Sequence, residues 1–213
     1  MNIAVIANGQ IHDDTIIFEK LKLFDTIIAA DGGANHCLHL GITPDLIMGD
    51  FDSITSQAME FYANVPKMQF KKDKDETDLE LVIKHAFLKG ANNVTLFAAT
   101  GNRVDHALVN LALLSRYPAK LFIETEDQTI LALDETVAFN SFKINTFPQQ
   151  TISFLPLLNK VEGVTSTGLK WELNNAILNE NFFSISNICL TSETSISIKK
   201  GKLLCFLLHK LTS

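Results

Sequence analysis

Residues 26–35 read TIIAADGGAN, a short apolar run that ends in an aspartate and two glycines. The apolar part, residues 26–30, is typical of a strand that is covered on both faces of its sheet. Similar short runs, rich in Ile, Val, Leu or Phe, lie at residues 3–7, 46–48, 94–98 and 121–124. The first 130 residues are therefore expected to contain a series of buried strands.

Helical segments alternate with these strands. Residues 78–89 place apolar side chains three and four positions apart, and Gly90 follows them as a stop signal. Residues 104–116 show the same helical spacing. Strands that alternate with helices predict an α/β fold with a doubly wound, mainly parallel sheet.

The pattern changes after about residue 130. Residues 195–199 alternate between polar and apolar side chains, and the Lys200-Gly201-Lys202 sequence is typical of a hairpin turn before a last strand. No convincing helix is expected in this half. The predicted fold is a small all-β sandwich, or jelly roll, over residues 131–213, after an α/β domain over residues 1–130. Its β-prone segments are residues 151–156, 160–166, 183–187, 195–199 and 203–209.

Composition and charge exclude several classes of function. Asp and Glu number 24 against 18 Lys and Arg, and the net charge of -6 does not favour nucleic acid as a partner. The N-terminus lacks the features of a signal peptide, and the apolar run at residues 203–208 is too short to cross a bilayer. Cys37, Cys189 and Cys205 have no metal-type spacing, which favours free thiols in a cytoplasmic protein.

Acidic residues lie where the predicted strands end. Asp31, Asp50 and Asp52 come directly after two apolar runs, and Asp78 begins the first predicted helix. The segment TGNRVDH at residues 100–106 follows a later run. Because the loops beyond the carboxyl ends of parallel strands form the ligand crevice of an open sheet, these segments are expected to converge at one edge.

The converging residues suit a magnesium–phosphate site. Mg²⁺ prefers carboxylate oxygens and commonly binds one or two carboxylates together with substrate phosphates. Asp50 and Asp52 are two residues apart in an extended segment and can point to the same side. Asp31 and Asp78 would complete an acidic pocket, and the glycine pair after Asp31 permits close approach of the backbone to a phosphate.

Each of these residues also has a simpler interpretation when it is taken alone. An aspartate after a strand often forms a turn, and Asp78 could act only as a helix cap. The lysines of residues 71–74 could belong to a solvated loop, and His36, Cys37 and His39 fit a helix surface better than a metal site. The site is predicted from the joint placement of the segments.

The same segments resemble, in order, the motifs of the thiamine pyrophosphokinase family. They are DGGAN at residues 31–35, PDLIMGDFDS at 44–53, KDETDLE at 74–80, TGNRVDH at 100–106, GLKW at 168–171 and SISN at 184–187. The resemblance spans nearly the whole chain. Several ordered motifs at compatible spacing are far more specific than a lone glycine pattern.

The resemblance implies an enzyme that transfers the pyrophosphoryl group of ATP to the hydroxyl of thiamine, giving thiamine diphosphate and AMP. It implies that Asp50, Asp52 and Asp78 hold Mg²⁺ and that Asp31 belongs to the same catalytic cluster. Contacts with ATP are expected from Gly32, Gly33, Asn35, Lys74, Thr77, Thr100, Gly101, Arg103, Asp105 and His106. Contacts with thiamine are expected from Trp171, Ser186 and Asn187.

The resemblance also implies a homodimer with the thiamine site where the subunits meet.

Asn102 stands where the family often has a second glycine. Asparagine tolerates the positive φ of such a turn, but the choice of nucleotide stays open. Two alternatives stay open as well: a pyrophosphokinase for another heterocyclic alcohol, and a non-catalytic nucleotide or thiamine sensor. Because phosphoryl-type transfer depends on positioning and charge stabilisation, no enzyme nucleophile is expected.

Overall fold

The computed structural model describes residues 1–73, 75–101 and 103–209. The chain divides into two compact units. The first contains Met1–Leu111 together with Ile123–Glu126, and the second contains Ala112–Phe122 and the residues from Asp127 onwards. Strand β6 (Leu121–Glu124) is therefore divided between the two units.

The first unit contains a parallel sheet with the strand order β5–β1–β2–β3–β4. Its strands are β1 (Asn2–Ile6), β2 (Thr26–Ala30), β3 (Leu46–Gly49), β4 (Lys67–Gln69) and β5 (Asn93–Phe97). The helices after them are α1 (Asp14–Leu21), α2 (Gly33–His39), α3 (Ser56–Phe61), α4 (Asp78–Leu88) and α5 (Val104–Leu114). Strand β4 has only one apolar residue, Met68, which explains why the sequence pattern did not predict it.

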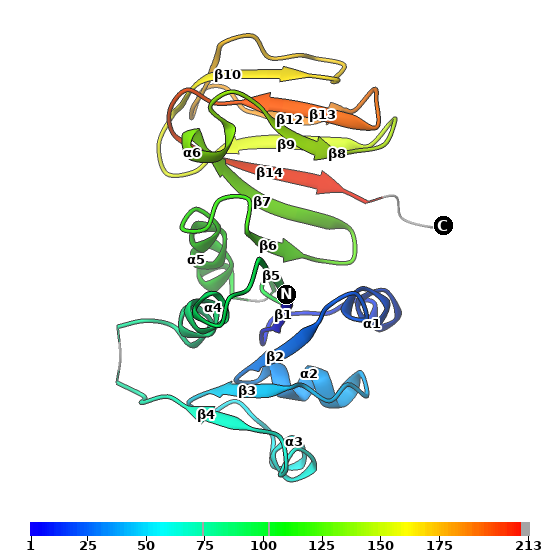
Figure 1. Cartoon of the computed structure of the whole chain (residues 1–213), viewed down its shortest axis with the longest axis vertical. Helices are drawn as coiled ribbons and strands as arrows, with labels where there is room; N and C mark the ends of the chain where they lie inside the picture. Colours follow the sequence, from blue (N-terminus) through cyan, green and yellow to red (C-terminus); the bar gives the residue numbers. More distant parts are fainter. Residues whose placement is uncertain (74, 102, 210–213) are drawn as a thin grey trace. The chain divides into compact units, whose positions relative to one another are not determined.

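Helices cover both faces of this sheet, as Figure 1 shows for α1 and α4. Ala4 and Ile6 of β1 belong to one apolar cluster with buried side chains of α1, α2 and α3. Val5 is also buried but lies outside that cluster, because successive side chains of a strand point to opposite faces. Helix α4 packs on β1, β2, β3 and β5. The predicted doubly wound sheet is confirmed.

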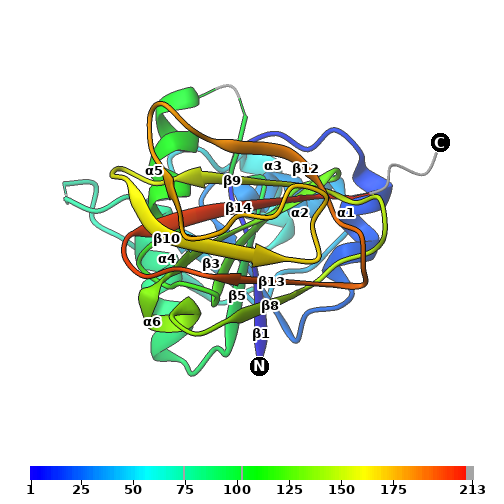
Figure 2. The same cartoon turned by 90° about the horizontal axis from the view of Figure 1, so that it is seen from above.

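The second unit has two groups of antiparallel strands, in the orders β12–β9–β14–β7 and β11–β10–β13–β8. Figure 2 shows β10, β13 and β8 side by side in the second group. The strands are β7 (Gln128–Asp134), β8 (Phe142–Asn145), β9 (Thr151–Pro156), β10 (Val161–Thr167), β11 (Ala176–Leu178), β12 (Ser184–Ile188), β13 (Glu193–Ser197) and β14 (Lys202–Leu208). One apolar core takes Phe154 and Leu203 from the first group and Val164 and Ile196 from the second. The sandwich prediction is confirmed.

Two details of this half differ from the prediction. A short helix, α6 (Glu135–Ala138), begins where the Asp134 side chain accepts a hydrogen bond from the Thr136 N–H at 2.9 Å. The Lys200–Lys202 turn does not form a hairpin, because β13 pairs with β8 and β10 whereas β14 pairs with β7 and β9. The chain crosses from one sheet to the other there, so that both strands contribute side chains to the shared core.

None of the helices in the described part of the chain combines the length and the apolar character needed to span a bilayer.

Candidate active site

A pocket of about 560 Å³ opens at the carboxyl ends of the parallel strands of the first unit. It takes Asn8 and Gly9 from the loop after β1, Asp31 from the end of β2 and Asp78 from the start of α4. Residues 98–101, after β5, and several residues at the start of α5 also line it. The predicted convergence of separate segments at this edge is therefore found in the structure.

Three carboxylates gather at this edge: those of Asp31, Asp50 and Asp78. Each offers one oxygen, and these oxygens lie within 4.8 Å of one another. Within the described residues, the Oδ1 atom of Asp31 is buried and has no hydrogen-bond partner. A buried carboxylate oxygen without a partner is costly unless a cation or a ligand satisfies it. The three side chains therefore fit a hard divalent cation.

The position of Asp31 depends on an unusual backbone conformation. Asp31 has a φ of 47°, and its N–H donates to the Met48 carbonyl of β3 at 2.7 Å. A Cβ atom at Gly49 would lie 2.8 Å from the Cβ of Asp31, so Gly49 permits the close approach. Burial raises the pKa of the Asp31 carboxyl, and the Ser53 hydroxyl and the Gly32 N–H lower it to a smaller extent.

Asp52 lies beside this group and not within it. Its Oδ1 accepts a hydrogen bond from the Ser53 hydroxyl at 3.0 Å, and its Oδ2 lies 3.8 Å from the ammonium nitrogen of Lys72. Its backbone N–H donates to Oδ1 of Asp50 at 3.1 Å. The positive φ of 69° at Phe51 turns the backbone between the two aspartates, so this segment is not the simple extended one that the sequence suggested. The role of Asp52 as a metal ligand stays a prediction.

Arg103 and Asp105 form a two-point ion pair in the pocket. The distances are 3.0 Å from Nε to Oδ1 and 2.7 Å between the terminal guanidinium nitrogen and Oδ2. This contact lowers the pKa of the Asp105 carboxyl and raises the pKa of Arg103. Both side chains are mostly exposed. The remaining pocket residues that were expected to contact ATP are Thr77, Thr100, Gly101 and His106.

The glycine pair of the DGGAN motif packs against protein backbone and side chain. A Cβ atom at Gly33 would lie 1.9 Å from the Ile6 carbonyl oxygen, and one at Gly32 would lie 2.3 Å from the Asn8 side chain. Either addition would require a shift of the neighbouring chain. The glycines are thus explained by close packing of α2 on the end of β1, and their contact with a phosphate stays a prediction.

Among the residues that the structure describes, the histidines and the cysteine of α2 belong to no group that could hold a metal ion. His36 Nε2 donates to the Gly9 carbonyl at 2.8 Å, and His39 Nε2 lies 2.6 Å from Oδ2 of Asp14. Cys37 is fully buried, and burial raises the pKa of its thiol to about 12. Helix α2 therefore uses these side chains for packing and loop contacts.

The predicted thiamine residues lie together in the second unit. Asn187 is buried, and its side-chain amide donates to the Trp171 carbonyl at 2.7 Å and accepts from the Trp171 N–H at 3.2 Å. The Trp171 side chain is 56% exposed, with the Lys170 ammonium nitrogen 4.5 Å from the ring centroid. Ser186 has a φ of 55° and its N–H donates to the Ser153 hydroxyl at 2.9 Å. Asn187 thus holds the backbone that presents an accessible indole.

Two family models match the chain in its two halves. The model described as "Thiamin pyrophosphokinase, catalytic domain" matches residues 19–125, and "Thiamin pyrophosphokinase, vitamin B1 binding domain" matches residues 140–203. The chain belongs to the thiamine pyrophosphokinase family. A thiamine pyrophosphokinase of Bacillus subtilis is 31% identical over 186 residues, which cover 83% of this chain and 84% of the relative. Thiamine pyrophosphokinase 1 of Arabidopsis thaliana is 28% identical over an alignment of 220 positions, which covers 87% of this chain and 81% of the relative.

Solved structures of thiamine pyrophosphokinases share this fold. The crystal structure of the Bacillus subtilis protein has a TM-score of 0.83 at 28% identity and covers 99% of this chain and 100% of its own. The structure from Geobacillus thermodenitrificans has a TM-score of 0.84 at 23% identity, with coverages of 100% and 99%. At that lower identity the likeness concerns the fold alone.

Two positions of the thiamine pyrophosphokinase motifs, Lys74 and Asn102, lie outside the described residues. Asn35 is described, and its side-chain amide bonds Ser53 and Thr55.

The loop after β1 lines the pocket, although the sequence analysis did not select it. Gly9 N–H donates to the Ala98 carbonyl at 2.6 Å, and Gln10 N–H donates to the Thr100 carbonyl at 2.8 Å. A Cβ atom at Gly9 would lie 2.1 Å from the Thr100 carbonyl oxygen. Asn8-Gly9 follows an apolar run as Asp31-Gly32 does, so the same criterion could have found this loop.

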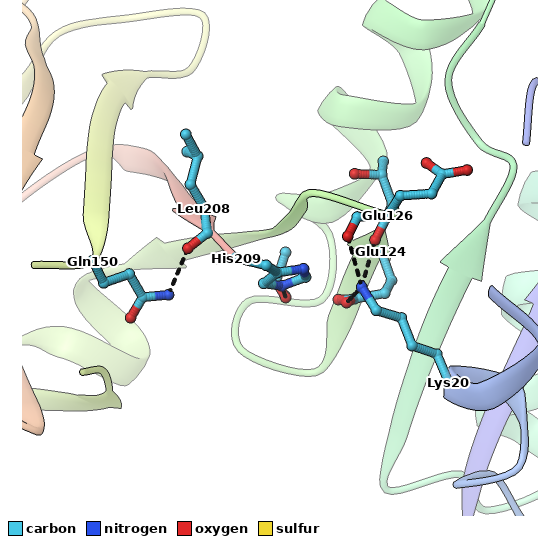
Figure 3. A network of polar contacts seen from close by, with 8 residues as sticks. Lys20, Glu124, Glu126, Gln150, Leu208 and His209 are labelled. Atoms are coloured by element: carbon cyan, nitrogen blue, oxygen red, sulfur yellow. Dashed lines mark hydrogen bonds and ion pairs between the residues drawn. The ribbon is translucent and has the colours of Figure 1, made fainter. Parts of the chain in front are cut away.

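The same loop is fixed farther along the chain by residues near Glu126. The Glu126 carboxylate accepts from the His12 N–H at 2.6 Å. Lys20 of α1 donates to Oε1 of Glu124 at 2.7 Å and to the Thr125 carbonyl at 2.6 Å, as Figure 3 shows for the labelled Lys20 and Glu124. These contacts connect α1 to residues 124–126 and hold the far end of the pocket loop.

Proposed function

We propose that this chain is a magnesium-dependent thiamine pyrophosphokinase that converts ATP and thiamine into AMP and thiamine diphosphate. The observation that carries the proposal is the carboxylate group of Asp31, Asp50 and Asp78 beside a pocket at the carboxyl edge of the sheet, in a chain that matches both family models. Residues 1–130 would serve ATP and magnesium, and residues 131–213 would serve thiamine. The protein would act in the cytoplasm.

The carboxylates would hold Mg²⁺ against the phosphates of ATP. Asp31, Asp50 and Asp78 supply the grouped oxygens, and Asp52 lies close enough to Asp31 for its charge to raise the Asp31 pKa. A bound Mg²⁺ would neutralise part of the phosphate charge that otherwise repels this acidic edge. The buried Oδ1 atom of Asp31, which has no hydrogen-bond partner among the described residues, supports a cation at this position.

The other pocket residues would orient the nucleotide. Arg103 offers a planar guanidinium that can turn from Asp105 to phosphate oxygens, since both side chains are exposed. The thiamine hydroxyl oxygen would form a bond to the β-phosphorus, and the bond from that phosphorus to the oxygen bridging the α-phosphorus would break. The AMP oxygen would leave with the electron pair, and the hydroxyl proton would pass to a pocket carboxylate or to water. No covalent intermediate with the enzyme is required.

The second unit would bind thiamine through Trp171, Ser186 and Asn187. The ammonium group of Lys170 lies over the indole ring, and the face of an indole is a favourable place for a cation. The thiazolium ring of thiamine is a flat cation and suits the same face. Apolar side chains shortly before Asn187 in the sequence are exposed, including Ile185 at 63% and Phe183 at 45%. Exposed apolar side chains of this size support a homodimer in which a second subunit completes the thiamine site.

Replacing Trp171 by alanine is expected to raise the KM for thiamine about 10-fold, because a cation–π contact contributes about 1–2 kcal/mol when it is desolvated. The KM for ATP should stay near that of the parent, since the nucleotide pocket lies in the first unit. Phenylalanine at this position should restore part of the thiamine affinity. Initial rates over a matrix of both substrates measure the two constants. An unchanged KM for thiamine would remove Trp171 from the acceptor site.

The identity of the acceptor is tested by comparing alcohols. The kcat/KM for thiamine should be about 100-fold or more above that for a pterin with a primary hydroxyl. A site shaped for one heterocycle leaves its polar groups unpaired when another heterocycle binds. Equal or better turnover of the pterin would favour a different pyrophosphokinase. Binding of ATP and thiamine without any turnover would favour a sensor.

A further inference from the structure

We propose that Asn35 is a positioning residue that fixes the geometry of the carboxylate group, in place of the direct contact with ATP that the sequence suggested. Asn35 lies in the first turn of α2. Its Nδ2 donates to the Ser53 carbonyl at 2.9 Å, and its Oδ1 accepts from both the N–H and the hydroxyl of Thr55, each at 2.9 Å. The inference rests on the proposed function, because it concerns the same cation site.

The segment that Asn35 holds is the one that carries Asp50 and Asp52. It leaves β3 at Gly49, passes through the positive φ of Phe51 and ends at Thr55, whose hydroxyl caps α3 by accepting from the Ala58 N–H at 3.2 Å. Bonds from Asn35 at Ser53 and Thr55 fix this segment near its α3 end. A loop fixed at both ends has less conformational freedom to lose when a ligand binds.

Ser53 transmits this restraint to the carboxylates. Its hydroxyl donates to Oδ1 of Asp52 at 3.0 Å, and Ser53 also lies in contact with the Asp31 carboxyl. Ser53 also lines the pocket. Because Asn35 holds the Ser53 carbonyl, it controls the residue that faces two of the aspartates.

Asn35 also connects the two chain segments that carry Asp31 and Asp50, which follow different strands. Helix α2 begins two residues after Asp31, and the segment that Asn35 bonds begins with Asp50. The side chain therefore ties the element after β2 to the element after β3 at the level of the site. Only a side chain with a donor and an acceptor in one planar group can make this set of bonds, which is why asparagine suits the position.

The test is the affinity for Mn²⁺, a spectroscopic substitute for Mg²⁺, measured on the full chain without nucleotide by the paramagnetic resonance signal of free Mn²⁺. Asn35→Ala should raise the Kd for Mn²⁺ about 10-fold or more, as expected when a residue that orients metal ligands is removed. His39→Ala is the matched control on the same helix. Its exposed contact with Asp14 lies outside the pocket, so this variant should change the Kd by less than about twofold.

A purely structural role would lower the melting temperature of Asn35→Ala and leave its Kd for Mn²⁺ equal to that of the parent, and this result would overturn the inference. If the parent protein itself binds no Mn²⁺, the proposed cation site is contradicted, and this result can be told apart from an unchanged Kd in Asn35→Ala.

If Asn35→Ala does not fold, the variants Thr55→Val and Thr55→Ser test the same inference. The valine removes one bond to Asn35 and should weaken Mn²⁺ binding, whereas serine retains the bond and should not. Equal affinities in the pair would overturn the inference.

Discussion

Replacing Asp31 by asparagine is expected to lower kcat about 100-fold or more while leaving the fold at least as stable as in the parent. The two side chains have nearly the same shape, so packing is retained. The charge that would hold the cation is lost, which accounts for the fall in turnover. The stability expectation follows from the buried Oδ1 atom. It has no hydrogen-bond partner within the part of the chain that the structure describes, so the carboxylate is costly to bury.

The pH dependence gives this prediction a definite sign. The Asp31 pKa is raised in the folded protein, so the folded state binds the proton more tightly than the unfolded state does. In EDTA, the stability of the parent relative to Asp31→Asn should be greatest below the unfolded pKa and should fall as the pH rises through the folded pKa. Urea unfolding at several pH values measures this difference.

Asp45→Asn is the matched control for Asp31→Asn. Asp45 is also an aspartate of the first unit, but its Oδ2 accepts from the Ile27 N–H at 2.8 Å and it does not line the pocket. Its replacement should leave kcat near the parent value. Parent-like turnover in Asp31→Asn would remove Asp31 from the cation site.

Replacing Gly33 by alanine should destabilise the protein by about 3 kcal/mol or more, the upper range for a steric change in a packed interior. The added Cβ would lie 1.9 Å from the Ile6 carbonyl oxygen, and this atom belongs to the backbone at the end of β1. The strand cannot move away without breaking its pairing with β2 and β5. Denaturant unfolding, or the yield of folded protein, measures the effect.

Gly90→Ala separates steric overlap from backbone strain. Gly90 has a φ of 86°, but an added Cβ would have no neighbour within 4 Å. That variant should cost only about 1 kcal/mol, the penalty for placing alanine in a left-handed conformation. If Gly33→Ala were no less stable than Gly90→Ala, the close packing of α2 on β1 would be contradicted.

The sequence was sufficient to predict the convergence of the acidic segments. Asp31 and Asp50 follow adjacent parallel strands, and strands of that kind end at the same edge of a sheet. The placement of each carboxylate could not be predicted in the same way. It depends on the positive φ values of Asp31 and Phe51, which turn each side chain individually.

Other features depend on contacts that are distant in sequence. The Lys200–Lys202 turn has the composition of a hairpin, but tertiary packing places its two flanking strands in different sheets. The packing of Gly33 against the Ile6 carbonyl leaves no local signal in the sequence, because the two residues are 27 positions apart. Asn35 likewise reveals its bonds to Ser53 and Thr55 only in the folded protein.

The most direct test of the proposed activity is to follow AMP and thiamine diphosphate together after the purified protein is mixed with ATP, Mg²⁺ and thiamine. The two products should form in equal amounts, and neither should form when EDTA is added or thiamine is left out. AMP or ADP without thiamine diphosphate, or bound substrates without any product, would contradict pyrophosphoryl transfer to thiamine.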